Sequence, residues 1–276
     1  MMVKTRLDVL ITERGLVESR AQAQRLVMAG QVRISGQVEL RPDARVMKDV
    51  EIAIDHGPRF VSRGGEKLEA AISAFDIDVQ GAVCADVGAS TGGFSDCLLQ
   101  HGAMRVYAID VGYGILHWKL RNDPRVVSME RTNARFVDRL PEPVSFISLD
   151  ASFISQKLLL PVLRAWLPPE GGRVVTLIKP QFEAGKEAVN RGEGVIQDPQ
   201  IHRQVVEDVL GFAEQTGFGV RGLIPSPLKG PKGNTEFLAW FEYPGRPGRE
   251  AEPWVERVFC EEKPDGEEEQ ADLDGE

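Results

Sequence analysis

Four ionisable residues lie at or near the ends of apolar runs of the chain. They are three acids and one lysine: Asp86, Asp110, Asp150 and Lys179. Runs of this length and pattern are typical of buried strands. The carboxyl ends of parallel strands meet at one edge of a sheet, where ligands bind in open α/β folds. The sequence therefore predicts a polar ligand site at that edge.

The turn that follows Asp86 is rich in glycine and contains Gly88, Gly92 and Gly93. A dinucleotide fingerprint needs glycine where Ser90 stands, and no lysine follows the last glycine as a phosphate-binding loop requires. The Asp86 carboxylate would repel a pyrophosphate and suits a cationic ligand. S-adenosylmethionine, with a sulfonium and an ammonium, is the predicted cofactor, and Asp110, 24 residues after Asp86, is expected at its ribose. The alternative is a tight turn that binds nothing.

Helical patterns alternate with these strands through residues 67–243. This alternation predicts a doubly wound, mostly parallel sheet with helices on both faces. Residues 56–66 contain four glycine or proline residues and are expected to be a linker. Residues 181–197 lack periodicity, and we expect them to form a mobile loop over the site.

The first 55 residues have a different pattern, which predicts two short helices and then strands. Leu7, Leu10 and Ile11 share one helix face, and Ser19 is the expected N-cap of a second helix that ends before Gly30. Arginines are spread over this unit, and the segment 19–36 resembles the S4 RNA-binding domain. Arginine binds two phosphate oxygens at once, although each arginine alone is equally consistent with a solvated surface. We expect RNA contacts from Arg6, Arg20, Arg25, Arg33 and, in the linker, Arg63.

The glycine-rich turn resembles motif I of the RrmJ/FtsJ-type methyltransferases. With the S4-like unit in front, residues 3–243 resemble the TlyA family of ribosomal RNA 2′-O-methyltransferases, which are also called hemolysin A-like proteins. Five segments carry this likeness in order: 59–68, 86–95, 148–153, 177–183 and 233–238. The resemblance implies a class I (Rossmann-like) methyltransferase domain with an S4-like α+β domain before it. It also implies methyl transfer to a cytidine 2′-hydroxyl in the RNA of one or both ribosomal subunits.

Enzymes of this type use a Lys-Asp-Lys-Glu tetrad, which the resemblance places at Lys67, Asp150, Lys179 and Glu236. A ribose hydroxyl must lose its proton as it attacks, so Lys179 is expected either to act as the base or to stabilise the oxyanion. Sequence leaves these two roles open. Taken singly, Lys67 is consistent with a surface lysine, Asp150 with a helix N-cap, and Glu236 with an outward residue of a strand.

The remaining expected contacts surround the cofactor. They come from the turn and the two strands beside it: Asp86, Gly88, Ser90, Thr91, Gly92, Gly93, Phe94, Asp110 and Asn133. Asn133 follows a third strand, where this fold contacts adenine, although it could equally be a helix N-cap. Three further cations could hold phosphates near the substrate: Arg191, Lys229 and Lys232.

The composition of the chain limits its location in the cell and the kinds of segment that it contains. The chain of 276 residues has a net charge of −9, but residues 250–276 hold twelve acids and two bases, so the body is close to neutral. We expect residues 244–276 to be a disordered acidic tail. The three cysteines have no metal-like spacing, and no long apolar segment predicts a signal peptide or a membrane span, so a cytoplasmic protein without a metal is expected.

Other functions remain open on the sequence alone. One is a ribosome assembly factor that binds RNA and S-adenosylmethionine without turnover. Another is a pore-forming hemolysin, which the second family name suggests and the absence of an apolar span disfavours. A nicotinamide oxidoreductase is disfavoured by Ser90.

Overall fold

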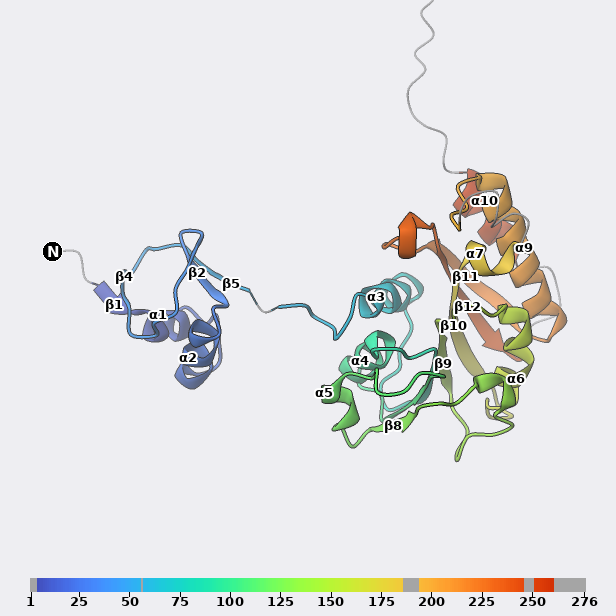
Figure 1. The fold of residues 1–276 in the computed structure, drawn as a ribbon, viewed down its shortest axis with the longest axis horizontal. Helices are drawn as coiled ribbons and strands as arrows, with labels where there is room; N and C mark the ends of the chain where they lie inside the picture. The colour runs from blue at the N-terminus through green and yellow to red at the C-terminus, as the bar shows by residue number, and fades with distance from the viewer. Residues whose placement is uncertain (1–3, 56, 186–193, 246–250, 261–276) are drawn as a thin grey trace, which may run out of the picture. The chain divides into compact units, whose positions relative to one another are not determined.

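The computed structural model describes residues 4–55, 57–185, 194–245 and 251–260. The chain divides into two compact units, Met1–Arg59 and Phe60–Glu276 (Figure 1). Residues 186–193, which include Arg191 and much of the expected loop at 181–197, lie outside the described part, as do 246–250 and 261–276.

The first unit packs two helices against short strands. Helix α1 (Leu7–Glu13) and helix α2 (Arg20–Met28) bury an apolar face that includes Leu7, Ile11 and Val27. The Ser19 hydroxyl accepts a hydrogen bond from the Gln22 amide, so the expected N-cap is confirmed. Strands β1 (Lys4–Arg6) and β4 (Arg45–Met47) pair with each other, and β2 (Val32–Ile34) pairs with β3 (Gln37–Val38) and β5 (Ile52–Ile54).

The second unit is built on a seven-stranded sheet in the order β11-β12-β10-β9-β6-β7-β8. Five strands are parallel: β6 (Val83–Val87), β7 (Arg105–Ile109), β8 (Val126–Met129), β9 (Phe146–Leu149) and β10 (Gly172–Ile178). Strand β12 (Phe237–Tyr243) runs antiparallel to β10 and to β11 (Gly219–Pro225). The expected doubly wound sheet is therefore confirmed, with one antiparallel strand inserted near an edge.

Helices cover both faces of this sheet (Figure 1). On one face lie α3 (Gly64–Phe75), α4 (Gly93–Gln100) and the short α5 (Trp118–Arg121). On the other lie α6 (Leu160–Arg164), α7 (Pro180–Glu183), α9 (Pro199–Gln215) and α10 (Glu252–Cys260). The strands are buried from both sides, which explains why their sequences are almost continuously apolar.

The structure differs from the expected linker and tail. Helix α3 begins at Gly64, and Phe60 is buried in the second unit, so the last part of the expected linker is folded. Residues 252–260, expected to be disordered, form α10, because Val255 and its apolar neighbours pack against the core beside α9. The acidic composition of this segment predicts disorder, but its apolar residues have helical spacing and form a buried face. Among the described residues, no helix is long and apolar enough to cross a bilayer.

Candidate active site

The four residues of the expected tetrad come from four elements that meet at one edge of the sheet. Asp150 follows β9 and Lys179 follows β10, and these strands are parallel neighbours, so both side chains start from adjacent carboxyl ends. Glu236 directly precedes β12, whose first residue pairs with the last residue of β10. Lys67 lies in α3, which packs against β12.

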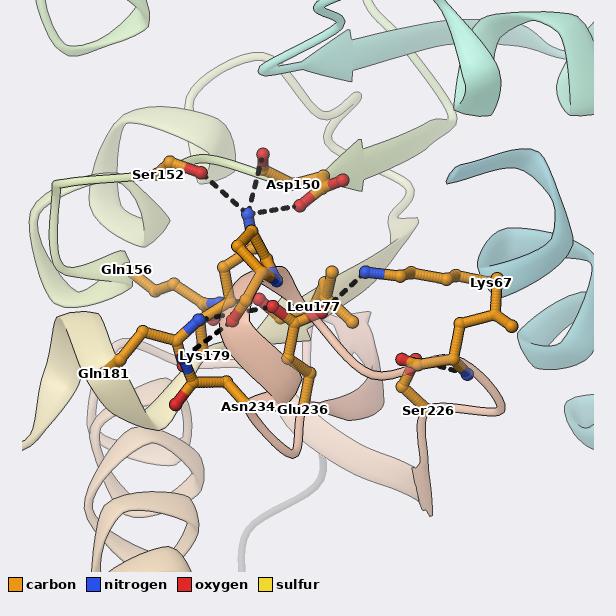
Figure 2. A network of polar contacts seen from close by, with 12 residues as sticks. Lys67, Asp150, Ser152, Gln156, Leu177, Lys179, Gln181, Ser226, Asn234 and Glu236 are labelled. Atoms are coloured by element: carbon orange, nitrogen blue, oxygen red, sulfur yellow. Dashed lines mark hydrogen bonds and ion pairs between the residues drawn. The ribbon is translucent and has the colours of Figure 1, made fainter. Parts of the chain in front are cut away.

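The tetrad forms two ion pairs, shown in Figure 2. Lys179 Nζ lies 2.6 Å from Asp150 Oδ1, and Lys67 Nζ lies 2.6 Å from Glu236 Oε2. The Lys67 side chain is 12% exposed and that of Glu236 is 0% exposed. Lys67 is therefore not a surface lysine and Glu236 is not an outward strand residue. Each ammonium is held in place by a carboxylate from another element.

Further polar contacts fix the positions of these pairs. The Ser152 hydroxyl lies 2.9 Å from Lys179 Nζ, and the Gln181 amide nitrogen donates to Glu236 Oε1 at 3.3 Å. Burial raises the pKa of the Asp150 carboxyl, and the charge of Lys179 acts in the opposite direction. Removal of either partner would leave a nearly buried charge unpaired, which is costly.

A hollow of about 360 Å³ opens in front of the tetrad. Four cations line it: Arg63, Lys67, Lys179 and Lys229. Among the described residues, the carboxylates of the lining are the two acids of the tetrad. An excess of ammonium and guanidinium groups suits a ligand that carries phosphate. Lys229 was expected near the substrate, and its place in the lining of this hollow is consistent with that expectation.

A second hollow, of about 680 Å³, lies beside the first and shares Gly88, Ser90, Asp150 and Ser152 with it. The charged residues described in its lining are Asp110, Asp150 and Arg135, so this hollow has more acids than bases. A hollow of this size holds a nucleoside-sized ligand, and its acids favour a cationic one. The residues present therefore fit S-adenosylmethionine.

Close approach of the backbone shapes the border between the two hollows. Gly88 has a φ of 84°, and a Cβ built on it would lie 2.6 Å from the Asp150 carbonyl oxygen. Asp110 accepts hydrogen bonds from the amides of Ser90 at 2.8 Å and Gly112 at 2.7 Å. The carboxylate thus joins the glycine-rich turn to the loop after β7, and it still faces the second hollow.

Asp86 does not take the position expected for a cofactor contact. Its side chain is fully buried and lines neither hollow. Oδ2 accepts bonds from the Ser95 amide and hydroxyl, and Oδ1 accepts one from Ser148, because the carboxylate lies beneath the turn at the start of α4. Burial raises the pKa of Asp86 to about 7. Asp86 therefore supports the turn from below and faces neither hollow.

The other expected cofactor residues line one or both hollows, with the exception of Gly92. Ser90 and Gly88 line both hollows, Asn133 lines the second, and three line the first: Thr91, Gly93 and Phe94. Gly92 lines neither, and a Cβ there would lie 2.1 Å from Leu120, so its role is packing. The Asn133 side chain also accepts a hydrogen bond from the Arg135 amide, so its interpretation as an N-cap is confirmed, and its contact with adenine stays a prediction.

The arginines expected to contact RNA are not equivalent. Arg6 and Arg20 both pair with Asp8, a buried carboxylate of α1. Hydrogen bonds, first from Arg6, hold the pKa of Asp8 well below its usual range despite its burial. These two arginines therefore stabilise the first unit. Arg25 and Arg33 are exposed, and within the described residues neither forms an ion pair with an acid. Arg63 is exposed at the first hollow.

Sequence reasoning missed several residues of the site. Ser152 and Gln181 contact the tetrad, and Gly230 lies so close to Glu236 that a Cβ there would be 2.1 Å from Oε1. Phe153, next to Ser152, has a φ of 63°, is 90% exposed and packs against Phe182. Ser152 and Gln181 lie within two residues of tetrad members, and that proximity was the available signal.

Comparisons with known proteins agree with this geometry. Residues 60–243 match the family of FtsJ-like methyltransferases, and residues 5–52 match the S4 domain family. The 16S/23S rRNA (cytidine-2′-O)-methyltransferase TlyA of Mycobacterium tuberculosis (strain ATCC 25618 / H37Rv) is 44% identical over 244 residues, which cover 87% of this chain and 90% of that protein. The chain belongs to the TlyA family of FtsJ-like methyltransferases.

Two further relatives extend the likeness over the whole TlyA-family chain. Hemolysin A of Brachyspira hyodysenteriae is 42% identical over 250 residues, which cover 86% of this chain and 99% of that protein. A solved structure from Streptococcus thermophilus, described provisionally as a hemolysin, has 44% identity and a TM-score of 0.71, covering 95% of this chain and 96% of its own. The resemblance drawn from the sequence is thus confirmed.

Proposed function

We propose that this TlyA-family chain transfers a methyl group from S-adenosylmethionine to the 2′-hydroxyl of a cytidine in ribosomal RNA. One observation carries the proposal: the paired tetrad lies where an acid-lined hollow of nucleoside size meets a hollow rich in lysine and arginine. The cytidine and the ribosomal target rest on the relatives, one of which is a 16S/23S rRNA (cytidine-2′-O)-methyltransferase.

The second hollow is the proposed cofactor site. Asp110, Asn133 and the backbone around Gly88 and Ser90 would hold S-adenosylmethionine there. When bound, this cofactor supplies an electrophilic methyl group on a sulfonium. The Asp150 and Asp110 carboxylates favour a cation in the hollow, and the turn fixes the position of the ligand against the border with the first hollow.

Lys179 is the proposed catalytic residue of this chain. Its Nζ lies 2.6 Å from Asp150 Oδ1 in an ion pair, so we assign Lys179 to stabilise the negative charge that develops on the ribose oxygen. The alternative role as base would use a neutral amine instead of this ion pair. Lys67 and Glu236, which also line the first hollow, position the sugar, and Arg63 and Lys229 bind its phosphates.

The test joins product mapping to cofactor binding. Ribosomal RNA is incubated with the purified chain and S-adenosylmethionine, and methylated nucleotides are mapped by mass spectrometry. We expect 2′-O-methylcytidine with the wild type and at least about a hundredfold less with Lys179→Ala, because such charge stabilisation is worth roughly 10²–10³ in rate. Calorimetry is expected to show unchanged S-adenosylmethionine affinity in the variant.

Three outcomes would overturn parts of the proposal. Methyl groups on bases instead of riboses would exclude 2′-O chemistry. Turnover like that of the wild type in Lys179→Ala would remove the mechanism. Binding of S-adenosylmethionine and RNA by the wild type without any transfer would identify an RNA-binding assembly factor instead.

A further inference from the structure

A second cluster of chemically active side chains lies between α3 and α4, away from both hollows. It consists of Glu69 on α3 and Cys97 and His101 at the end of α4. The spacing of four residues places Cys97 and His101 on one side of their helix. One ligand atom from each of the three residues lies within 4.8 Å of the other two, and none of the three residues lines a hollow of the active site.

Two of these groups converge on a single oxygen. His101 Nε2 lies 2.6 Å from Glu69 Oε2, and Cys97 Sγ lies 3.7 Å from the same atom. In a tetrahedral zinc site with bonds of about 2.0–2.3 Å, neighbouring ligand atoms are separated by roughly 3.3–3.8 Å. The separation of 3.7 Å falls within that range and the separation of 2.6 Å lies below it, so side-chain rotations that move His101 away from Glu69 would bring the three atoms to ligand positions.

We propose that Glu69, Cys97 and His101 form a zinc site. A sulfur, an imidazole nitrogen and a carboxylate oxygen suit Zn²⁺, whereas Mg²⁺ and Ca²⁺ prefer oxygen alone. On binding, the thiol proton of Cys97 and any proton held between His101 and Glu69 leave to solvent. The thiolate and the carboxylate then balance the two positive charges. His101 is 29% and Glu69 22% exposed, which leaves room for water as the fourth ligand.

The site would connect two elements that carry the active site. Lys67 lies two residues before Glu69 in α3, and α4 begins at Gly93 in the cofactor turn. A metal bound by both helices stabilises the folded state in which Lys67 and the turn face one another. We therefore expect zinc to raise the thermal stability of the chain, independently of the proposed methyl transfer.

The experiment uses the full-length chain, reduced and without an affinity tag. Co²⁺ is the first probe, because a cobalt–thiolate bond gives a charge-transfer absorption, and Zn²⁺ is then added in competition. We expect one Co²⁺ per chain with the thiolate band and full displacement by Zn²⁺. Cys97→Ala should abolish the band, and His101→Gln should weaken binding at least about tenfold. Cys260→Ala is the control and should bind like the wild type, since Cys260 lies in α10.

Thermal melting supplies a second readout. Zinc should raise the melting temperature of the wild type and of Cys260→Ala, but not that of His101→Gln. Glu69→Gln provides a third ligand variant if Cys97→Ala does not fold, which a melt in chelator would show. The proposal is overturned if Co²⁺ binds without the thiolate band, if His101→Gln and Glu69→Gln retain wild-type affinity, or if the wild type binds no metal at micromolar concentrations.

Discussion

Three oxygen atoms surround the Lys179 ammonium, and they hold it with different strength. Asp150 Oδ1 forms an ion pair at 2.6 Å and the Ser152 hydroxyl a hydrogen bond at 2.9 Å, whereas the Asp150 carbonyl at 3.5 Å is a weak third partner. The strong contacts fix the direction of the side chain. The weak contact can be exchanged for a substrate oxygen at little cost, which is what stabilisation of a developing oxyanion requires.

Ser152→Ala tests this positioning. The substitution removes one strong contact, and we expect kcat to fall about tenfold with little change in KM, because a hydrogen bond to a charged group contributes roughly 1.5–3 kcal/mol. Methyl-transfer kinetics with ribosomal RNA measure both constants. Ser145→Ala is the control, since that hydroxyl contacts Val83 at the opposite end of the sheet. Equal kcat values in the two variants would mean that Ser152 does not position Lys179.

Asp86 gives the fold a pH dependence. Its pKa is raised to about 7 by burial, so between the unfolded value near 4 and pH 7 the folded chain holds a proton that the unfolded chain has released. The contribution of this residue to stability is therefore greatest below pH 4 and falls as the pH rises to 7.

Asp86→Asn should remove that decline. The difference in the free energy of unfolding, variant minus wild type, should increase from pH 5 to pH 7 by up to about 1.4 kcal/mol per pH unit. Urea titrations at several pH values measure it. A constant difference over that interval would show that the folded carboxyl titrates at its ordinary value. Because Asp86 lies beneath the cofactor turn, the same variant separates support of the turn from direct ligand contact.

At the scale of elements, α3 and α4 approach one another through glycine. A Cβ at Gly65 would lie 2.3 Å from the ring of the buried Phe60, and one at Gly93 would lie 2.8 Å from the Gly65 amide nitrogen. The sequence predicts that Gly64 and Gly65 belong to the linker 56–66. Their small size is instead what lets two helices pack closely enough to bring Lys67 over the sheet edge.

Gly65→Ala and Gly211→Ala should have opposite effects on stability. Gly65→Ala displaces Phe60 and is expected to cost about 1–3 kcal/mol, with a fall in kcat because Lys67 moves with α3. Gly211 lies inside α9 with nothing within 4 Å of a built Cβ, so Gly211→Ala should stabilise by about 0.5–1 kcal/mol and leave turnover unchanged. Denaturant unfolding measures both, and destabilisation of similar size in the two variants would contradict the packing argument.

The elements differ in how far sequence could predict them. The parallel strands were predictable because burial on both faces makes them continuously apolar, and the tetrad followed from the family resemblance. Helix α10 could not be predicted in this way, because its charged composition conceals the apolar face around Val255. The buried position of Asp86 was also missed, since a strand-end acid has the same sequence pattern whether it faces a ligand or lies beneath a turn.

At the scale of the whole molecule, charge is unevenly distributed. The chain has a net charge of −9, yet the first 59 residues hold ten Lys/Arg and eight Asp/Glu. Arg6 and Arg20 form ion pairs with the buried Asp8, so the bulk charge of this unit offers little attraction for RNA. We expect any affinity for RNA to come from exposed cations such as Arg25 and Arg33, which form no ion pair with an acid among the described residues of their unit.

The double variant Arg25→Glu/Arg33→Glu should therefore lose affinity for ribosomal RNA and keep affinity for S-adenosylmethionine. Each lost phosphate contact lowers the slope of log K against log salt by about 0.7–0.9, so we expect binding at low salt to weaken at least about tenfold and the slope to become shallower by roughly 1.4–1.8. Binding is measured by filter retention over a range of salt concentrations. Arg25→Lys/Arg33→Lys keeps the charge and should retain most of the slope, while losing affinity only where the guanidinium binds two oxygens at once. If the glutamate variant binds with the wild-type slope, the RNA surface lies elsewhere in the chain.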